Sequence, residues 1–574
     1  MVAIPGYKDL FGDQIISYNE YVKTIPSDVI ITILIMLNNE LNATLPELEN
    51  QKRLLKLISR QYSQDQLKKL NSVFFNYKQK KNSHFEGYIF GRRYLLSFIL
   101  KELNNYRQFE IDDTTADDEF KFLMAYFLVI DEVNGKDNHL YEEALKKSSE
   151  PLGNYRMLWT PNINQYDFND RSDPAFQFYK LLCFVDYLSN TYHDKAKEFV
   201  NKLGFKTFGQ LLGSLHLVTM TTLDYKQDNV FKKLHFITTP EGIDNSHLKA
   251  QSIKELIGSK ELSLNDIKKY PLFFNHRNEY MVIDEDIYNK KIYKGPFFEL
   301  YYSTTLKDTL KFNQYSAEVS LKVLEQSCFK GILSSLQYSK HDVLHFDDDS
   351  DSSPDCYYRH NKDVFLLEFK GYLFPEDLSS NPEFDKIKEY IDSRFIKNEK
   401  GKSKGITQLL NQINLLYKNE LKFDKRYSEE LYKKRITIYP IVCHNDFVFS
   451  MPGINEYLND IFENQIDSHI KEHFIIKPVT LIDLQILNDF LRGGGNFKLL
   501  GFFVDRYNKI IESRKLLAIK KLEVDTFLKS KSSFDEIYNS IFSSEIKKQQ
   551  KSKDVTKRLF DLAGIKLEVL DKEL

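Results

Sequence analysis

The sequence predicts a mixed α+β protein in three parts: a large helical region over residues 1–260, an α/β core over 261–480 and a helical region over 481–574. Three observations support this division. A chain of 574 residues is too long for one ordinary hydrophobic core. Apolar residues recur at three- and four-residue spacing in the first part, which is typical of amphipathic helices. Beyond about residue 300, short apolar runs of strand type alternate with helical stretches, which favours a mixed sheet covered by helices.

The N-terminal region contains helical patterns but no catalytic motif. Polar turn formers interrupt it at 112–119 and at 160–174, and the second interruption is where the region could divide into two subdomains. At the start of the second part, residues 271–283 form two apolar runs around an Asn-His-Arg turn, which predicts a hairpin. We expect the helical region to recognise a substrate or a protein partner, or to mediate homo-oligomerisation.

The charge balance excludes a protein that coats nucleic acid with its whole surface. Eighty Lys and Arg against 82 Asp and Glu give a formal charge of −2, so any nucleic-acid surface must be a local patch. Residues 386–435 are such a patch, with fourteen Lys and Arg against seven Asp and Glu, and aromatic residues lie between them. This composition suits a surface that follows a phosphate backbone, and a solvated lysine-rich surface is the alternative.

Cysteine usage and apolar run lengths indicate a soluble cytoplasmic protein. The four cysteines are far apart and form no CxxC pair, which argues against a zinc ribbon or a disulfide scaffold. The N-terminus lacks the basic start and apolar core of a signal peptide. The longest apolar runs, such as 122–130, are about half the ~20 residues that cross a bilayer. We therefore expect no membrane association.

The segment richest in chemical information is Pro354-Asp355 followed by Glu368-Phe369-Lys370. The second triplet ends an apolar run, 364–367, which reads as a buried strand. Strand side chains alternate with a period of two, so Glu368 and Lys370 share one face. Charged groups at the end of a buried strand cost desolvation free energy unless they are paired or bind a metal. Two carboxylates and an ammonium can hold a divalent cation and a water beside a phosphodiester.

On these residues the chain resembles the PD-(D/E)xK nuclease superfamily, the restriction-endonuclease-like proteins. A following helix with Gln408 and Gln412 at i, i+4 adds to the resemblance. The resemblance implies a mixed four-stranded sheet flanked by helices, and catalysis with Mg²⁺, for which Mn²⁺ would substitute. It assigns catalytic roles to Asp355, Glu368, Lys370 and Gln408, and metal ligation to Asp355, Glu368 and Glu318. Glu325, seven residues further along the same predicted helix, is the alternative to Glu318.

Several other residues compete with this interpretation. The acidic loop before the motif offers rival first ligands: Asp347, Asp348, Asp349 and Asp351. The loop is no EF-hand, because Ser352 stands at the required glycine and Tyr358 at the bidentate acid. His444 and Asp446 follow the last predicted strand, and we interpret them as ordinary loop residues. No G-x-x-x-x-G-K-[ST] motif occurs, so no P-loop is present.

The sequence therefore predicts a metal-dependent nuclease that acts on DNA rather than RNA. By fold analogy alone, a nuclease with a large helical region resembles prokaryotic restriction or anti-phage defence effectors. Cutting both strands with one site per chain would favour a homodimer. Two alternatives remain: a non-catalytic nucleic-acid-binding or assembly protein on a degenerate nuclease fold, and an RNA-directed nuclease.

Overall fold

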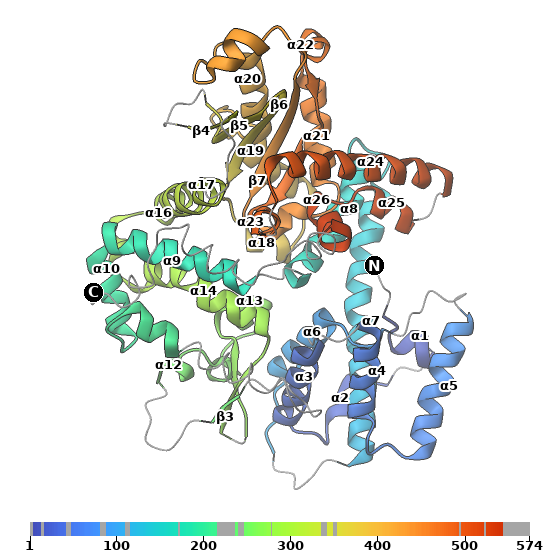
Figure 1. Ribbon diagram of the computed structural model, residues 1–574. Coiled ribbons are helices and arrows are strands. Elements are labelled where there is room, and N and C mark those ends of the chain that lie inside the picture. Colours follow the sequence, from blue (N-terminus) through green and yellow to red (C-terminus); the bar gives the residue numbers. More distant parts are fainter. Residues whose placement is uncertain are drawn as a thin grey trace. The chain divides into compact units, whose positions relative to one another are not determined.

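The protein divides into two compact units in a computed structural model (Figure 1). Unit 1 contains Met1–His139 and His193–Thr305, and unit 2 contains Leu140–Tyr192 and Leu306–Val569. The residues that the structure describes are 4–12, 16–41, 47–80, 88–109, 115–169, 173–214, 236–238, 246–276, 278–334, 341–347, 353–492, 495–521 and 524–542.

Unit 1 is mainly helical, as its apolar spacing predicts. Its helices are α1 (Tyr7–Phe11), α2 (Tyr18–Val22), α3 (Ser27–Leu41), α4 (Glu47–Ile58), α5 (Gln64–Lys80), α6 (Arg92–Asn104), most of α7 (Ala116–Lys146), α10 (His193–Lys202), α12 (Ser246–Lys249), the 3₁₀ helix η2 (Ile253–Leu256), α13 (Leu264–Lys269) and α14 (Glu285–Ser303).

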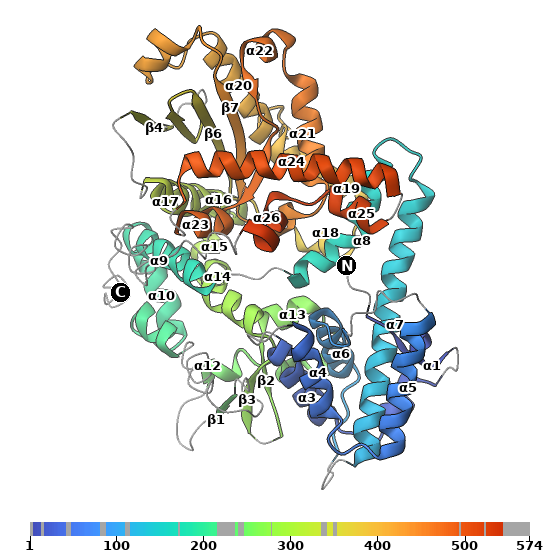
Figure 2. The same cartoon turned by 45° about the vertical axis from the view of Figure 1, so that its right-hand side comes forward.

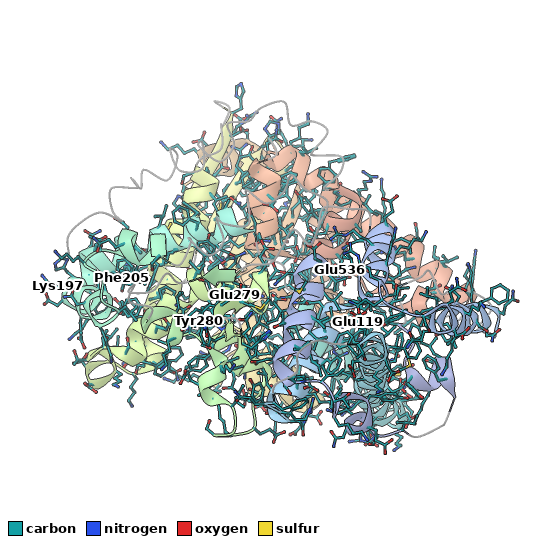
Figure 3. The ribbon with its side chains drawn as sticks, turned by 90° about the horizontal axis from the view of Figure 1, so that it is seen from below. Glu119, Lys197, Phe205, Glu279, Tyr280 and Glu536 are labelled. Atoms are coloured by element: carbon teal, nitrogen blue, oxygen red, sulfur yellow. The ribbon has the colours of Figure 1, made fainter. Side chains whose placement is uncertain are left out.

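A small antiparallel sheet of order β1-β3-β2 completes unit 1. Its strands are β1 (Phe236–Thr238), β2 (Leu272–Phe274) and β3 (Glu279–Val282). The predicted hairpin is confirmed by the pairing of Leu272 with Val282. Asn278 takes the left-handed conformation (φ 59°) that its turn requires. Glu279 and Tyr280 mark β3 in Figure 3. The hairpin pairs with β1 and takes no part in the larger sheet of unit 2.

The sheet of unit 2 is mixed, with the order β4-β5-β6-β7-β8 and with β9 also paired to β7. Its strands are β4 (Asp342–Phe346), β5 (Cys356–His360), β6 (Asp363–Lys370), β7 (Thr437–His444), β8 (Ile475–Ile476) and β9 (Thr480–Asp483). The pairs β4–β5 and β5–β6 are antiparallel, whereas β6, β8 and β9 run parallel to β7. The predicted mixed sheet is confirmed, but the number of four strands is wrong. Strands β8, with two residues, and β9, with four, are too short for an apolar pattern to reveal them in the sequence.

The remaining elements of unit 2 are helical. They are α8 (Gly153–Asn169), α9 (Pro174–Thr191), α15 (Leu306–Thr309), α16 (Phe312–Val319), the π-helix η3 (Ser320–Phe329), α17 (Lys330–Ser334), α18 (Glu376–Ser380), α19 (Phe384–Phe395), α20 (Gly405–Tyr417), the π-helix η4 (Tyr427–Leu431), the 3₁₀ helix η5 (Phe447–Ser450), α21 (Ile454–Gln465), α22 (Ser468–His473), α23 (Leu484–Arg492), α24 (Phe497–Lys521), α25 (Val524–Ser530), α26 (Phe534–Ile537) and the π-helix η6 (Tyr538–Phe542).

Helices cover both faces of this sheet (Figure 2). One face packs against α8, α19, α20 and α21 in a continuous apolar core, to which β6 contributes Val364 and Leu366. The other face packs against α24, where Phe365 stacks on Tyr439 with ring centroids 4.6 Å apart. Gly501 of α24 allows this approach, because a Cβ there would lie 3.1 Å from the Phe365 ring. Burial on both faces explains why β6 and β7 read as unbroken apolar runs.

The unit boundaries fall at different positions from the divisions that the sequence suggested. The chain enters unit 2 at Leu140, returns to unit 1 at His193 and enters unit 2 again at Leu306. The expected interruption at 160–174 is shorter than its composition indicated, because α8 continues through Pro161. Across the described residues, no helix combines the length and apolarity that a membrane span requires.

Candidate active site

The motif residues meet at one end of the sheet. Asp355 immediately precedes β5, while Glu368 and Lys370 lie at the end of β6. The antiparallel register pairs Cys356 with Leu367, and this brings Asp355 beside Glu368. The main-chain N–H of Phe369 donates to Oδ2 of Asp355 at 2.6 Å and fixes that carboxylate against β6. The pairing of β5 with β6 therefore places the two carboxylates of the motif side by side.

The Lys370 ammonium lies between these two carboxylates. Its Nζ is 2.8 Å from Oε2 of Glu368 and 3.7 Å from Oδ2 of Asp355, and it also donates to the Phe369 carbonyl at 3.0 Å. The Glu368 side chain is fully buried, and those of Lys370 and Asp355 are 8% and 14% exposed. Both carboxylates thus already share one cation, with a small opening to solvent on the Asp355 side.

Helix α20 supplies one amide to the buried carboxylate of Glu368. Gln412 donates from Nε2 to Oε1 of Glu368, so the helix holds the buried carboxylate from the side opposite Lys370. The contact belongs to Gln412, whereas no such contact is seen for the predicted catalytic Gln408. The amide oxygens of Gln408 and Gln412 are both buried without a hydrogen-bond partner within the described structure. Unpaired buried oxygens are costly, and a bound cation or water would satisfy them.

The two candidate glutamates, Glu318 and Glu325, have different neighbours. Glu318 accepts hydrogen bonds from Tyr187 and Tyr192, the latter at 2.8 Å, and none of its described contacts reaches the motif. Burial raises the pKa of Glu325 to about 7, and the charge of Asp355 adds to that rise, which Lys330 and Lys370 oppose. The Glu318 carboxylate is thus occupied by two tyrosines, whereas the alternative, Glu325, interacts with the charges of Asp355 and Lys370.

Glu318 and Glu325 lie on different faces of this helical segment because part of it is a π-helix. Seven residues return to the same face of an α-helix, but the chain from Ser320 to Phe329 forms i→i+5 turns that rotate less per residue. Gly371 lets this π-helix approach the end of β6, since a Cβ there would lie 2.2 Å from Oγ of Ser320. Stacking of Phe329 on Phe369, with centroids 5.2 Å apart, completes the contact.

The acidic loop before the motif meets a second lysine. Lys330 donates to the main-chain carbonyl of Asp347 at 3.2 Å and lies 4.0 Å from Oε1 of Glu325. The rival acids Asp348, Asp349 and Asp351 lie outside the described residues. Asp347, Asp355, Glu368 and Glu325 are four acidic residues against Lys330 and Lys370, so carboxyl groups outnumber the lysines at this end of the sheet.

Burial and the two lysines act on the proton affinities of this cluster in opposite directions. Burial and the charge of Asp355 raise the pKa of Glu368, against Lys370 and Gln412. Burial lowers the pKa of Lys370, but Glu368 and Asp355 outweigh it and leave it above its ordinary value. The raised pKa of Glu368 and the raised pKa of Lys370 conflict, because only an ionised Glu368 can raise the pKa of Lys370. We regard the pair as ionised, since both groups that contact the Glu368 oxygens are hydrogen-bond donors.

The oxygen atoms of this cluster are of the kind that bind a hard divalent cation. Three carboxylates and two unpaired amide oxygens are the oxygen ligands that Mg²⁺ and Mn²⁺ take. However, no three His, Cys, Asp or Glu side chains of the described residues are gathered as a metal site. The Lys370 ammonium lies where Asp355 and Glu368 converge. Asp355 and Glu368 are the residues that would hold a cation at this end of the sheet.

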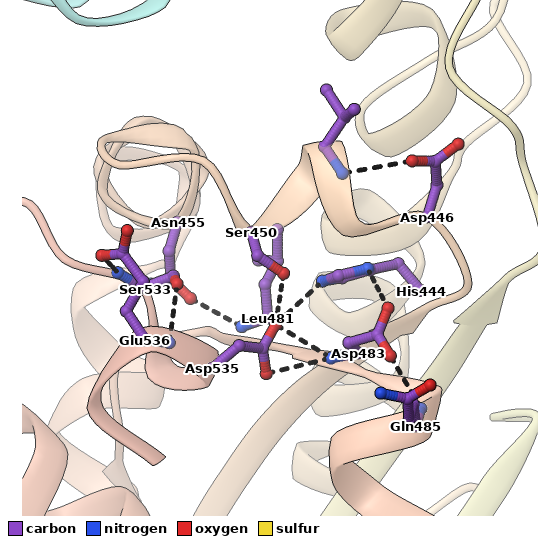
Figure 4. A network of polar contacts seen from close by, with 11 residues as sticks. His444, Asp446, Ser450, Asn455, Leu481, Asp483, Gln485, Ser533, Asp535 and Glu536 are labelled. Atoms are coloured by element: carbon purple, nitrogen blue, oxygen red, sulfur yellow. Dashed lines mark hydrogen bonds and ion pairs between the residues drawn. The ribbon is translucent and has the colours of Figure 1, made fainter. Parts of the chain in front are cut away.

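A second buried charged cluster lies one strand away (Figure 4). His444 is the last residue of β7, in register with Lys370 on β6 and with Asp483 on β9. Its ring nitrogens lie 3.6 Å from the carboxylates of Asp483 and Asp535, and the side chains of His444 and Asp535 have no exposed surface. Our interpretation of His444 as an ordinary loop residue was wrong. The one sequence signal for a role of His444 was its place at the end of a predicted buried strand.

The C-terminal region completes that cluster. Asp535, from α26, accepts hydrogen bonds from Oγ of Ser450 and from the main-chain N–H of Asp483 at 3.2 Å. Burial lowers the pKa of His444, but Asp535 and Asp483 outweigh it and raise it above its ordinary value. Burial raises the pKa of Asp483 to about 7. Asp446 binds elsewhere, accepting from the N–H groups of Phe374 and Val448.

Comparison with known proteins adds no relative. No family model, no curated protein and no solved structure matches the chain.

Proposed function

We propose that unit 2 is a metal-dependent nuclease that hydrolyses phosphodiester bonds of DNA. The observation that carries the proposal is that the carboxylates of Asp355 and Glu368 both face the Lys370 ammonium at the end of β5 and β6. A buried carboxylate pair costs desolvation free energy that a purely structural strand would avoid. The presence of this pair beside the Gln412 amide, whose oxygen is buried without a hydrogen-bond partner among the described residues, favours a site that accepts a cation.

Each residue has a role that follows from its contacts. Asp355 and Glu368 hold the cation, and Gln412 orients Glu368 by donating to Oε1. A bound Mg²⁺ would offset charge at the phosphate and lower the pKa of a water. The carboxylates of Glu368 and Asp355 keep the pKa of Lys370 above its ordinary value, so it acts as an ammonium that orients a water or stabilises the pentavalent phosphate, rather than as a base. Gln408 would offer its amide oxygen to the same space.

The test is cleavage of supercoiled plasmid in the presence of Mg²⁺ or Mn²⁺. Glu368→Gln and Lys370→Met should each reduce the rate by at least about a hundredfold, because each removes a charge that the reaction needs. Lys386→Met is the matched control, since Lys386 is exposed and pairs only with Glu383 at 2.7 Å. Equal cleavage by the wild type and both site variants would remove these residues from the mechanism. A matched RNA strand tests the RNA-directed alternative.

One observation favours a second candidate, a non-catalytic nucleic-acid-binding protein on a degenerate nuclease fold. Lys370 fills the position between the carboxylates and neutralises much of their charge without a metal. Under this alternative the Lys370 bridge is permanent and stabilises the fold. The protein would then bind DNA but leave plasmid intact with either metal, and Lys370→Met would lower its thermal stability.

A further inference from the structure

The basic stretch from Lys386 to Arg435 separates into charges that are already neutralised and charges that are not. Lys386 pairs with Glu383, Lys388 with Asp392 at 2.5 Å, and Arg426 with Glu430 at 3.4 Å. The Arg394 guanidinium lies over the rings of Tyr372 and Tyr390. Among the lysines of this stretch without a described ion pair, Lys397, Lys400 and Lys404 lie before α20, and Lys418, Lys422, Lys425, Lys433 and Lys434 lie at its end or after it.

The first group lies on a tight hairpin, residues 396–404, which we call the basic hairpin. Lys397 pairs with Ser403 across it, and the N–H of Lys404 donates to the carbonyl of Ile396 at 2.8 Å. Asn398 accepts from the N–H groups of residues 400 and 402 at 3.1 and 2.9 Å. Gly401 turns the chain with a positive φ of 73°. The main chain of the hairpin is thus fixed by its own hydrogen bonds, and its lysines project from a preorganised loop.

The topology places the basic hairpin at the end of the sheet that carries the candidate active site. Strands β6 and β7 are parallel, so the connection that contains α18, α19, α20 and η4 must return from the carboxyl end of β6 to the amino end of β7. Gln412 contacts Glu368 near the carboxyl end of β6. At the other end of α20, the Tyr417 ring lies 6.3 Å from that of Phe474, next to the start of β8. The hairpin therefore precedes α20 on the active-site side, and Lys422, Lys425 and Lys434 lie on the opposite side.

We propose that the basic hairpin binds the phosphate backbone of the nucleic acid that the site cuts, with Lys397, Lys400 and Lys404 as its contacts. This inference rests on the proposed function. Eight residues separate Gln412 from Lys404, about 12 Å along a helix. That distance matches about three to four nucleotides of a strand that rises 3.4 Å per nucleotide. The hairpin thus holds the strand a few nucleotides from the scissile bond, and it contacts phosphates rather than bases.

The test compares two variants with the same loss of three lysine charges. One combines Lys397→Gln, Lys400→Gln and Lys404→Gln, and the control combines Lys422→Gln, Lys425→Gln and Lys434→Gln. The binding of a fluorescein-labelled DNA duplex is measured by anisotropy over a range of salt concentrations, with EDTA present so that no cleavage occurs. The hairpin variant should bind at least about tenfold more weakly at about 0.1 M salt, with a salt slope flatter by about 2.7. The control should change the affinity by less than about twofold.

Equal losses in the two variants, or no loss in the hairpin variant, would overturn the inference. Absence of DNA and RNA binding by the wild type would overturn it as well. An RNA duplex as the second probe distinguishes the source of the phosphates, and a loss confined to RNA would support the hairpin contact with RNA as the substrate. Because binding is measured without metal, DNA binding through the hairpin by a protein that never cuts would contradict only the proposed function.

Discussion

The two charged clusters at the carboxyl end of the sheet differ in how they are assembled. The motif cluster comes mainly from Asp355, Glu368 and Lys370, which lie within sixteen residues of chain, and its ammonium is 2.8 Å from its nearest carboxylate. The His444 cluster joins residues 444, 483 and 535, and its ring nitrogens stay 3.6 Å from either carboxylate. In the first cluster the ammonium is tightly paired, and α20 carries buried amide oxygens without a hydrogen-bond partner among the described residues. In the second, both His444 ring nitrogens are buried without a hydrogen bond in that same part of the chain, and α26 supplies one of the two carboxylates that face them. We infer that the first serves the reaction and the second secures the C-terminal region to the sheet.

The largest expected effect concerns the stability that the second cluster provides. Asp535→Ala removes the carboxylate that faces His444 and accepts from Ser450 and Asp483, so it leaves a buried charge with one counter-ion. Breaking a buried pair in this way should lower the free energy of unfolding by about 3–5 kcal/mol, measured by urea denaturation. Glu463→Ala is the control, because its pair with Lys471 is exposed and should contribute less than about 1 kcal/mol. Equal stability of the two variants would contradict the assigned role of Asp535.

The second prediction concerns which glutamate belongs to the motif cluster. Glu325→Gln should weaken Mn²⁺ binding by about tenfold, because it removes a carboxylate charge beside Asp355. Glu318→Gln is a matched control on the same helical segment, since the Glu318 carboxylate is occupied by Tyr187 and Tyr192. Calorimetric titration measures both affinities. A larger effect of Glu318→Gln would reverse our assignment.

The third prediction uses the pH dependence of the second cluster. Asp483 and His444 both hold a proton more tightly in the folded protein, since their pKa values rise above the ordinary 3.8 and 6.5. Their contribution to stability is therefore complete below these ordinary values. The Asp483 part is lost as the pH rises from 3.8 through about 7, and the His444 part is lost above 6.5.

This loss is measured as the change in Tm between mildly acidic and mildly alkaline buffers. The wild type should melt at a lower temperature in the alkaline buffer, and Asp483→Asn should reduce that difference by at least about 2 °C. An unchanged difference in the variant would show that Asp483 does not titrate in this range. Glu463→Gln is the control, because its pair with Lys471 is exposed.

The same contrast explains what the sequence could predict. Asp355, Glu368 and Lys370 are recognisable because strand alternation and a short loop bring near neighbours together. The hairpin of β2 and β3 and the helix α20 follow equally local rules. His444, Asp483 and Asp535 meet only through the pairing of β7 with β9 and the packing of α26, which no local pattern encodes. The sequence could not decide between Glu318 and Glu325, because a π-helix changes the helical phase and hydrophobic spacing does not reveal a π-helix.

Binding of Mn²⁺ to the motif cluster tests the central claim most directly. Electron paramagnetic resonance measures free Mn²⁺ during a titration of the wild type and of Asp355→Asn, without reference to activity. The account predicts saturable binding by the wild type and its loss in Asp355→Asn, since that variant removes one of the two carboxylates that converge on Lys370. Equal Mn²⁺ binding by the two proteins, or none by the wild type, would contradict the assignment of this strand end as a metal-dependent nuclease site.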